Sequence, residues 1–214
     1  MTKKLSSLLW LFILCMLAAC SKPYGHYEDD KMIGTVLRVE PDNHLLEVDI
    51  SEWHKRDLRG GIDDYGMSVT VENTDEMVFK KEDGTLTDAQ HIKIGQKVLV
   101  KPPMDQKDGD YKAEEIIVLE MTYKEKYKQL LSNHKDLYRI TVFTKEDPLP
   151  QETEKKLMDL LSKSTLGIGS YPENYIVDYE KELDIEQYSV FLVFDHKGFV
   201  FKSYDVEEVE AFID

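Results

Sequence analysis

The sequence predicts an α+β protein whose folded part begins with a small five-stranded β-barrel and ends with an α/β domain. Three observations support this prediction. In residues 32–120, short runs alternate apolar and polar side chains, which is the period of half-buried strands. In residues 136–214, strand-like runs alternate with amphipathic helical runs. The first nineteen residues are of a different kind, and we exclude them from the fold.

Residues 1–19 have the organisation of a secretory signal. Lys3 and Lys4 precede an apolar run over residues 8–17, and two small residues stand before Cys20. The apolar run is shorter than the roughly 20 residues that a membrane-spanning helix needs. We therefore predict a signal peptide over residues 1–19 that is cleaved from the mature protein.

The end of this leader, Leu17-Ala18-Ala19-Cys20, resembles a bacterial lipobox. The resemblance implies diacylglyceryl transfer to the Cys20 sulfur and cleavage just before it. It also implies that acyl chains such as palmitate hold the mature lipoprotein on the extracytoplasmic face of the cell membrane. Each buried CH₂ contributes about 0.8 kcal/mol, so two or three chains anchor a protein stably. The alternative is a plain signal peptide that happens to contain a cysteine.

Residues 20–31 are polar, contain Pro23 and Gly25, and show neither a helical nor a strand period. We interpret them as a tether. A flexible coil of about ten residues spans roughly 18 Å, which would keep the folded part close to the bilayer.

The charge of the chain limits its partners. Its 214 residues include 27 Lys and Arg against 42 Asp and Glu, a formal net charge of -15. Phosphate binding depends on clustered Lys and Arg, so we expect no nucleic-acid binding. Cleavage before Cys20 removes two lysines and no acidic residue from that charge, which leaves -17. It also removes Cys15, so with an acylated Cys20 we expect no disulfide and no redox-active pair.

Within residues 32–120, turn residues separate a series of short strand-like runs. These runs cover residues 33–39, 45–50, 68–72, 76–80, 97–101 and 111–119. Residues 86–92 are expected to form a short helix capped by Thr87 or Asp88. Together these runs and the short helix approximate the order of an OB-like barrel, which has five short strands with one short helix between the third and the fourth. The alternation of apolar and polar residues alone does not distinguish this barrel from another small barrel or a roll.

Two segments in this region, residues 94–100 (IGQKVLV) and residues 113–118 (AEEIIV), carry a family resemblance. Residues 33–120 resemble an OB-like domain of unknown function that recurs in small lipoproteins of Bacillus-type bacteria. The resemblance covers less than half of the chain and implies no activity. Single-strand binders need a basic groove with stacking aromatic residues, and this region is acid-rich with scattered aromatic residues.

A helical connector is predicted over residues 121–135, because Tyr123, Tyr127, Leu130 and Leu131 recur at helical spacing. In residues 136–214, strands are predicted at 137–144, 175–178, 189–194 and 198–202. Helices are predicted at 151–163 and from Asp205, a plausible N-cap, to the end of the chain.

From Phe191 through the last hairpin to the closing helix, the chain is similar to the second half of a thioredoxin-like fold. The C-terminal domain is therefore expected to be thioredoxin-like, without its chemistry. Residues 144–148 (TKEDP) stand where a thioredoxin has its Cys-x-x-Cys motif, and Tyr188-Ser189 stands in place of its cis-proline. Fold analogy alone assigns no function.

Other motifs give no catalytic, cofactor or metal site. The histidines do not fall at zinc-ligand spacings; they are His26, His44, His54, His91, His134 and His196. The acidic residues Asp105, Asp108 and Asp110 lack the spacing of a calcium loop, and residues 167–170 have the composition of a loop. The long glycine-bearing loop 56–65 is the best candidate for a binding loop.

These observations favour an extracytoplasmic, membrane-anchored lipoprotein that acts as a binding or adaptor module. Its expected partners are membrane lipid, through acylated Cys20, and another envelope protein or a small ligand. One alternative is an envelope enzyme, a hydrolase that uses loop carboxylates. Another is a structural or immunity-like spacer that blocks a partner.

Overall fold

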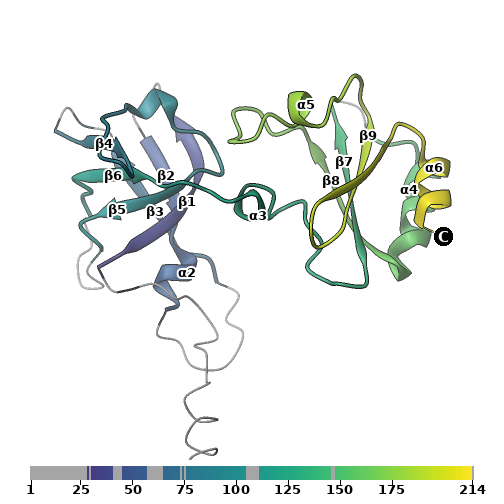
Figure 1. Ribbon diagram of the computed structural model, residues 1–214, viewed down its shortest axis with the longest axis horizontal. Coiled ribbons are helices and arrows are strands. Elements are labelled where there is room, and N and C mark those ends of the chain that lie inside the picture. The colour runs from purple at the N-terminus through teal and green to yellow at the C-terminus, as the bar shows by residue number, and fades with distance from the viewer. Residues whose placement is uncertain are drawn as a thin grey trace, which may run out of the picture.

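The computed structural model describes residues 28, 30–40, 45–56, 65–72, 74, 76–104, 111–145 and 148–213. The described residues form two lobes, each built on one β-sheet (Figure 1). A narrow connection that contains the helix α3 (Tyr123–Lys126) joins them. The predicted signal peptide and Cys20 lie outside the described residues.

The first lobe contains a six-stranded sheet with the strand order β3-β2-β1-β5-β6-β4. Its strands are β1 (Met32–Glu40), β2 (Leu45–Asp49), β3 (Ser68–Glu72), β4 (Val78–Lys81), β5 (Lys97–Lys101) and β6 (Glu115–Val118). Neighbouring strands are antiparallel except β4 and β6, which are parallel. Two short helices complete the lobe, α2 (Ser51–His54) and the 3-10 helix η1 (Ala89–His91).

The alternation of apolar and polar residues in the sequence decides which side chains of these strands are buried. In β5, Val98 and Val100 are fully buried, whereas the residues between and beside them are only partly buried. The same alternation in β3 buries Val69 and Val71. These side chains join Trp53 of α2 in one apolar core, because a strand presents every second residue to the same face.

The predicted five-stranded OB-like barrel is wrong. Among the described residues, the sheet has six strands, mixes parallel with antiparallel pairs and does not close. The runs 68–72 and 76–80 become β3 and β4, which lie at opposite edges of the sheet. The physical reason lies in the strand pairing. β3 pairs with β2 and β4 pairs with β6, so β3 and β4 do not pair with each other, as closure of the sheet would require.

The second lobe contains a four-stranded sheet with the order β10-β9-β7-β8. Its strands are β7 (Tyr138–Thr144), β8 (Ser164–Ser170), β9 (Val190–Phe194) and β10 (Phe199–Ser203). Its helices are α4 (Gln151–Asp159), the 3-10 helix η2 (Leu160–Ser162), α5 (Tyr179–Glu182) and α6 (Val206–Ile213). In Figure 1, α4 and α6 lie together on the outer side of this sheet, far from the first lobe.

Both faces of this sheet carry an apolar core. Leu157 of α4 and Val209 of α6 pack with Ile140 and Val142 on one face. Aromatic residues such as Tyr179 pack on the other face. All five residues of β9 are therefore buried, as expected for a central strand covered on both sides.

The predicted α+β division into a barrel and a thioredoxin-like domain is also wrong, because the structure is mostly β with few and short helices. Residues 175–178, predicted as a strand, form no named strand, and Tyr175 makes only an isolated bridge to Ile94. The second strand of the lobe is β8, which includes residues 167–170 that the sequence predicted to be a loop. A Cβ on Gly167 would lie 3.1 Å from Nη2 of Arg139, so glycine leaves room for that guanidinium.

The connector forms less helix than its apolar spacing predicts. A helix of four residues, α3, begins after Thr122, whose side chain forms a capping box with Glu125. Turn hydrogen bonds follow, in which the amides of Leu130 and Leu131 both donate to the carbonyl of Tyr127. Of the side chains predicted to share a face, Tyr127, Leu130 and Leu131 are buried in the second lobe, whereas Tyr123 is 45% exposed. Turns, and not a long helix, place the three buried side chains there.

Candidate binding groove

The strand β3 has one unpaired edge. It pairs with β2 in an antiparallel register that places Val69 opposite Val48. The amide of Ile50 donates to the carbonyl of Met67 at 2.8 Å, which fixes the pairs that exchange hydrogen bonds. Because exchanging pairs alternate along such a ladder, the amide and carbonyl of Thr70 point away from β2. In the described part of the chain, no strand pairs with this edge.

A groove of about 1630 Å³ lies between β3 and the start of β4. Val69 and Met77 contribute apolar surface to it, together with Tyr111 and Ala113. Met77, Tyr111 and Ala113 are partly buried and pack on the core of the first lobe. The failure of the sheet to close therefore leaves a long opening with an apolar floor.

The wall formed by β4 is already partly covered. The amide of Thr87 donates to the carbonyl of Phe79 at 2.9 Å, and the amide of Lys81 donates to the carbonyl of Thr85 at 2.8 Å. These bonds occupy groups on the side of β4 that faces away from β6. In the described part of the chain, main-chain groups of β4 are thus already bonded next to the groove, whereas no strand pairs with the outer edge of β3.

Tyr111 stiffens one side of the groove. Its hydroxyl donates to the carbonyl of Pro102 at 2.6 Å. Burial raises the pKa of this hydroxyl, and the charge of Glu114 raises it further. The phenol is therefore neutral at physiological pH and acts as a hydrogen-bond donor.

Acidic side chains outnumber basic ones around the groove. The charged lining residues are Asp30, Glu72, Glu76, Glu114 and Glu115 with Lys101 and Lys112. Glu115 is neutralised by Lys80 and by Lys101 at 3.6 Å, and the hydrogen bond from Lys80 is the main cause that lowers its pKa. The other four acidic residues make no ion pair with a described residue.

Loop 56–65, the binding loop predicted from the sequence, has only its two ends in the described structure. The Arg56 guanidinium lies 4.0 Å from the centroid of the Trp53 ring. At the other end, the Tyr65 ring meets His54 edge-on at 5.8 Å, and the Lys55 ammonium lies 4.7 Å from it. Both ends are thus held at α2. Residues 57–64 and the acidic residues of 105–110 lie outside the described residues.

The described residues bring together no cluster of three metal-ligating side chains. His91 Nδ1 contacts Asp88 at 2.8 Å on the surface, beside the cap of η1. His54 and His196 each have a buried Nδ1 atom without a hydrogen-bond partner among the residues that the structure describes. His26 and His44 lie outside the described residues.

A smaller cavity of about 410 Å³ lies in the second lobe, where α4 and α6 begin. Pro150, Thr153 and Tyr188 line it, and the peptide bond between Tyr188 and Ser189 is cis. Lys156 and Glu207 also line this cavity, and they form an ion pair with each other. Its one lysine therefore already has a counter-charge.

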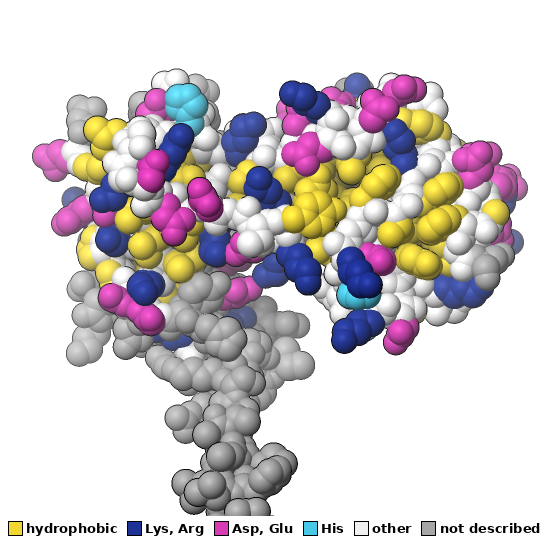
Figure 2. All heavy atoms as spheres, viewed as in Figure 1, with side chains coloured by type: hydrophobic (Ala, Val, Ile, Leu, Met, Phe, Trp, Pro, Cys, Tyr) yellow, Lys and Arg dark blue, Asp and Glu magenta, His cyan; other side chains and the backbone are white. Residues whose placement is uncertain are grey.

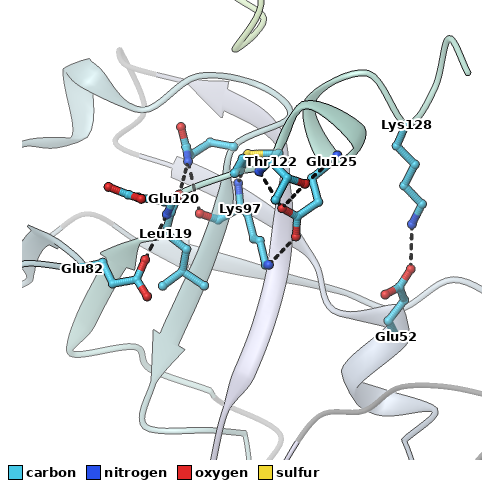
Figure 3. A network of polar contacts seen from close by, with 10 residues as sticks. Glu52, Glu82, Lys97, Leu119, Glu120, Thr122, Glu125 and Lys128 are labelled. Carbon is cyan, nitrogen blue, oxygen red and sulfur yellow. Dashed lines mark hydrogen bonds and ion pairs between the residues drawn. The ribbon is translucent and has the colours of Figure 1, made fainter. Parts of the chain in front are cut away.

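A polar network fastens the connection to the first lobe (Figure 3). Lys97 of β5 contacts Glu125 of α3 at 2.5 Å, and Lys128 contacts Glu52 of α2 at 2.8 Å. The Glu120 amide also donates to Glu82 at 3.1 Å. These contacts fix where the chain leaves the first lobe.

Apolar side chains are also gathered on the visible face of the second lobe, whereas charges of both signs cover much of the first (Figure 2). The exposed apolar residues of the second lobe include Phe199, Val200 and Phe212. The Phe212 ring stacks on Phe201 with centroids 4.5 Å apart. The Phe212 ring is therefore covered on one side by a ring of its own lobe.

Comparison of the chain with protein-family models, with curated proteins and with solved structures gave no match. In the described ranges, no helix is long and apolar enough to cross a membrane. The groove was not foreseen from the sequence. The sequence does contain the acidic residues Glu72, Glu76 and Glu114 of the groove, each within a strand-like run. That they lie close together depends on the order of the strands in the sheet.

Proposed function

We propose that the protein is a lipid-anchored, extracytoplasmic binding or adaptor module of the cell envelope. The observation that carries the binding part of this proposal is the groove, which combines an apolar floor, a strand edge without a described partner and a surplus of carboxylates. The anchor part rests on the leader and the lipobox-like segment ending in Cys20.

The lining of the groove favours binding over hydrolysis. It contains threonine hydroxyls but no histidine, serine or cysteine among the described residues. A carboxyl that acts as a general acid needs a raised pKa, and the pKa of Glu115 is lowered instead. The groove therefore gives the hydrolase alternative no support.

Fractionation of cells that express the full chain tests the anchor. We expect the wild-type protein in the membrane fraction, with the mass of acyl chains on the peptide that begins at Cys20. The variant Cys20→Ser should lack this mass and should accumulate as an unprocessed precursor or in the medium. If Cys20→Ser is cleaved at the same place and stays membrane-bound, the anchor proposal is wrong.

Cross-linking in cells tests the binding role. The anchored wild-type chain should give a specific, saturable cross-linked product with another envelope protein, identified by mass spectrometry. A chain carrying Glu72→Lys and Glu114→Lys reverses charges in the groove and should lose that product. The absence of any saturable product in wild-type cells would contradict a binding role through a protein.

A further inference from the structure

We propose that the groove binds an extended, basic segment of a partner protein, which adds to the sheet as a new strand against β3. This proposal rests on the proposed binding function and specifies its partner. It commits to a polypeptide, because the groove offers main-chain hydrogen-bonding groups in a row.

The first step of the argument is the hydrogen-bonding edge. The register of β3 with β2 turns the main-chain groups of Ser68, Thr70 and Glu72 outward, which is every second residue of the strand. An added strand would lie about 4.8 Å from β3 and pair with these groups. A row of free groups of this kind is a ready template for another chain.

The second step is space. The groove measures about 1630 Å³, which exceeds the roughly 300–1,000 Å³ typical of pockets for small ligands. It extends from β3 past Met77 and Val78 to Pro102 and Tyr111. A groove of this size, lined from β3 to Tyr111, can accommodate a segment of polypeptide in extended form.

The third step is the alternation of side chains. A strand added to β3 would point every second side chain the same way as Val69 and Val71, toward the apolar core. Met77 and Ala113 line that side. The intervening side chains would point the same way as Thr70 and Glu72. The partner segment should therefore alternate apolar and polar residues.

The fourth step is charge. Asp30, Glu72, Glu76 and Glu114 line the groove without an ion-pair partner among the described residues. The whole chain has a formal net charge of -15. Lysine or arginine at the polar positions of the partner segment would be attracted, whereas acidic peptides, nucleic acids and anionic lipid surfaces would be repelled.

A synthetic probe tests this inference on the full chain, purified in mild detergent. The probe is a capped peptide of seven residues in which lysine and valine alternate, and its control has glutamate in place of lysine. We expect the basic peptide to bind, to bind more weakly as NaCl rises from about 50 to about 500 mM, and the acidic peptide not to bind. Hydrogen exchange of the Thr70 and Glu72 amides should slow when the basic peptide is bound.

A pair of variants separates backbone pairing from side-chain contact. Thr70→Pro removes an amide that points away from β2, so the pairing with β2 is retained while the free edge is blocked. Thr70→Ala keeps the amide. We expect Thr70→Pro to weaken binding by about tenfold or more, since it loses a hydrogen bond and adds a steric block, and Thr70→Ala to change it by less than about threefold.

If Thr70→Pro does not fold, as judged by circular dichroism, peptides with N-methyl groups give the same information on the wild-type chain. Two such peptides are compared, one N-methylated at the lysines and the other at the valines. In an added strand only one of these two sets of amides faces β3, so only one of the two peptides loses its pairing. One set should abolish binding and the other should not. Equal binding of both sets would overturn the inference, as would slowed hydrogen exchange away from β3.

The outcomes distinguish this inference from the proposed function. If wild-type cells give a cross-linked envelope partner that Thr70→Pro retains, the strand-addition inference is wrong and the binding function stands. If no partner is found in cells although the basic peptide binds β3, the edge exists as proposed and the adaptor function fails.

Discussion

The ring of Tyr175 in the second lobe lies directly against Gly95 in the first lobe. A Cβ atom on Gly95 would be 2.5 Å from Cε2 of that ring. Main-chain bonds hold the same place, since the amide of Ile94 donates to the carbonyl of Asn174 at 3.0 Å and the amide of Ile176 donates to the carbonyl of Ile94 at 2.8 Å. The two lobes are therefore in contact here as well as through the connector.

Gly95→Ala should weaken this contact. Gly95 has a φ of 82°, a conformation that costs an L-residue about 1–2 kcal/mol, and its new methyl group would also collide with Tyr175. We expect a loss of about 2–4 kcal/mol in the free energy of unfolding, measured by urea denaturation.

Gly84→Ala is the matched control for that variant. Gly84 has a similar φ of 86°, but nothing lies within 4 Å of its Cβ position. It should therefore show only the backbone cost, about 1–2 kcal/mol. Equal losses in the two variants would mean that the Tyr175 ring moves aside without cost.

The Lys97–Glu125 pair should make stability depend on pH in the acid range. The hydrogen bond from Lys97 is the main cause that lowers the pKa of Glu125 from its ordinary value of 4.5 to about 2. A carboxyl with a lowered pKa in the folded state stabilises the fold above its unfolded pKa. That contribution is lost as pH falls from about 4.5 through about 2.

Glu125→Gln should therefore lower stability at pH 7 and flatten its decline below pH 4.5. The side chains of Lys97 and Glu125 are 28% and 36% exposed, so solvent screening limits the loss to about 1 kcal/mol. Urea denaturation between pH 7 and pH 2.5 measures it. Glu173→Gln, at an exposed position without a described contact, should leave the pH profile unchanged.

The neighbouring Lys128–Glu52 pair should contribute much less. Its side chains are 73% and 59% exposed, although its 2.8 Å distance is as short as that of a strong pair. Lys128→Met should change the free energy of unfolding by no more than about 0.5 kcal/mol, and less at high salt. A loss as large as that of Glu125→Gln would show that exposure does not rank these two pairs.

Trp53 should be a main support of the first lobe. Its side chain is 1% exposed, and its Nε1 donates to the carbonyl of Glu28 at 3.2 Å. Trp53→Phe should cost about 1–3 kcal/mol, because it removes this bond and part of the contact with Arg56. Trp53→Ala should cost about 3–5 kcal/mol, measured by far-ultraviolet circular dichroism in urea. Tyr65→Phe, at a residue that is 40% exposed, should have little effect.

Tyr127 should tie the connector to α5. Its hydroxyl donates to Glu182 at 2.5 Å, and burial raises the pKa of that hydroxyl. Tyr127→Phe retains the ring contacts with Tyr123 and Tyr179 and removes only the hydrogen bond. We expect a loss of about 1–2 kcal/mol in the free energy of unfolding, measured by urea denaturation. A loss below about 0.5 kcal/mol would show that this hydrogen bond does not tie the connector to α5.

Local signals in the sequence predicted many elements correctly. Asp88 caps η1 by accepting from the amide of Gln90, and Asp205 accepts from the amide of Glu207 at the start of α6. The alternation in residues 97–101 predicted β5 and the faces of its side chains. Such features depend on the period of one segment and on hydrogen bonds to near neighbours.

Elements that depend on distant partners were predicted wrongly. Residues 167–170 belong to β8 because β7 pairs with them and Gly167 leaves room for Arg139. Residues 175–178 have the composition of a strand, yet they meet the other lobe at Ile94 instead of joining the sheet. The anchor at Cys20 and the loop 57–64 lie outside the described residues, so these stay predictions.

Composition and short-range period are enough to establish the acidic charge and to predict the alternating faces of β2, β3 and β5. They also predict a leader with a lipobox-like end. The tertiary structure of the described residues establishes that the first sheet stays open between β3 and β4 and so forms the groove. It also decided that Glu72 and Glu114, far apart in the chain, line the same groove. Strand order depends on which strand edges pair across long sequence separations. The alternation of side chains within one strand does not specify which strand lies beside it.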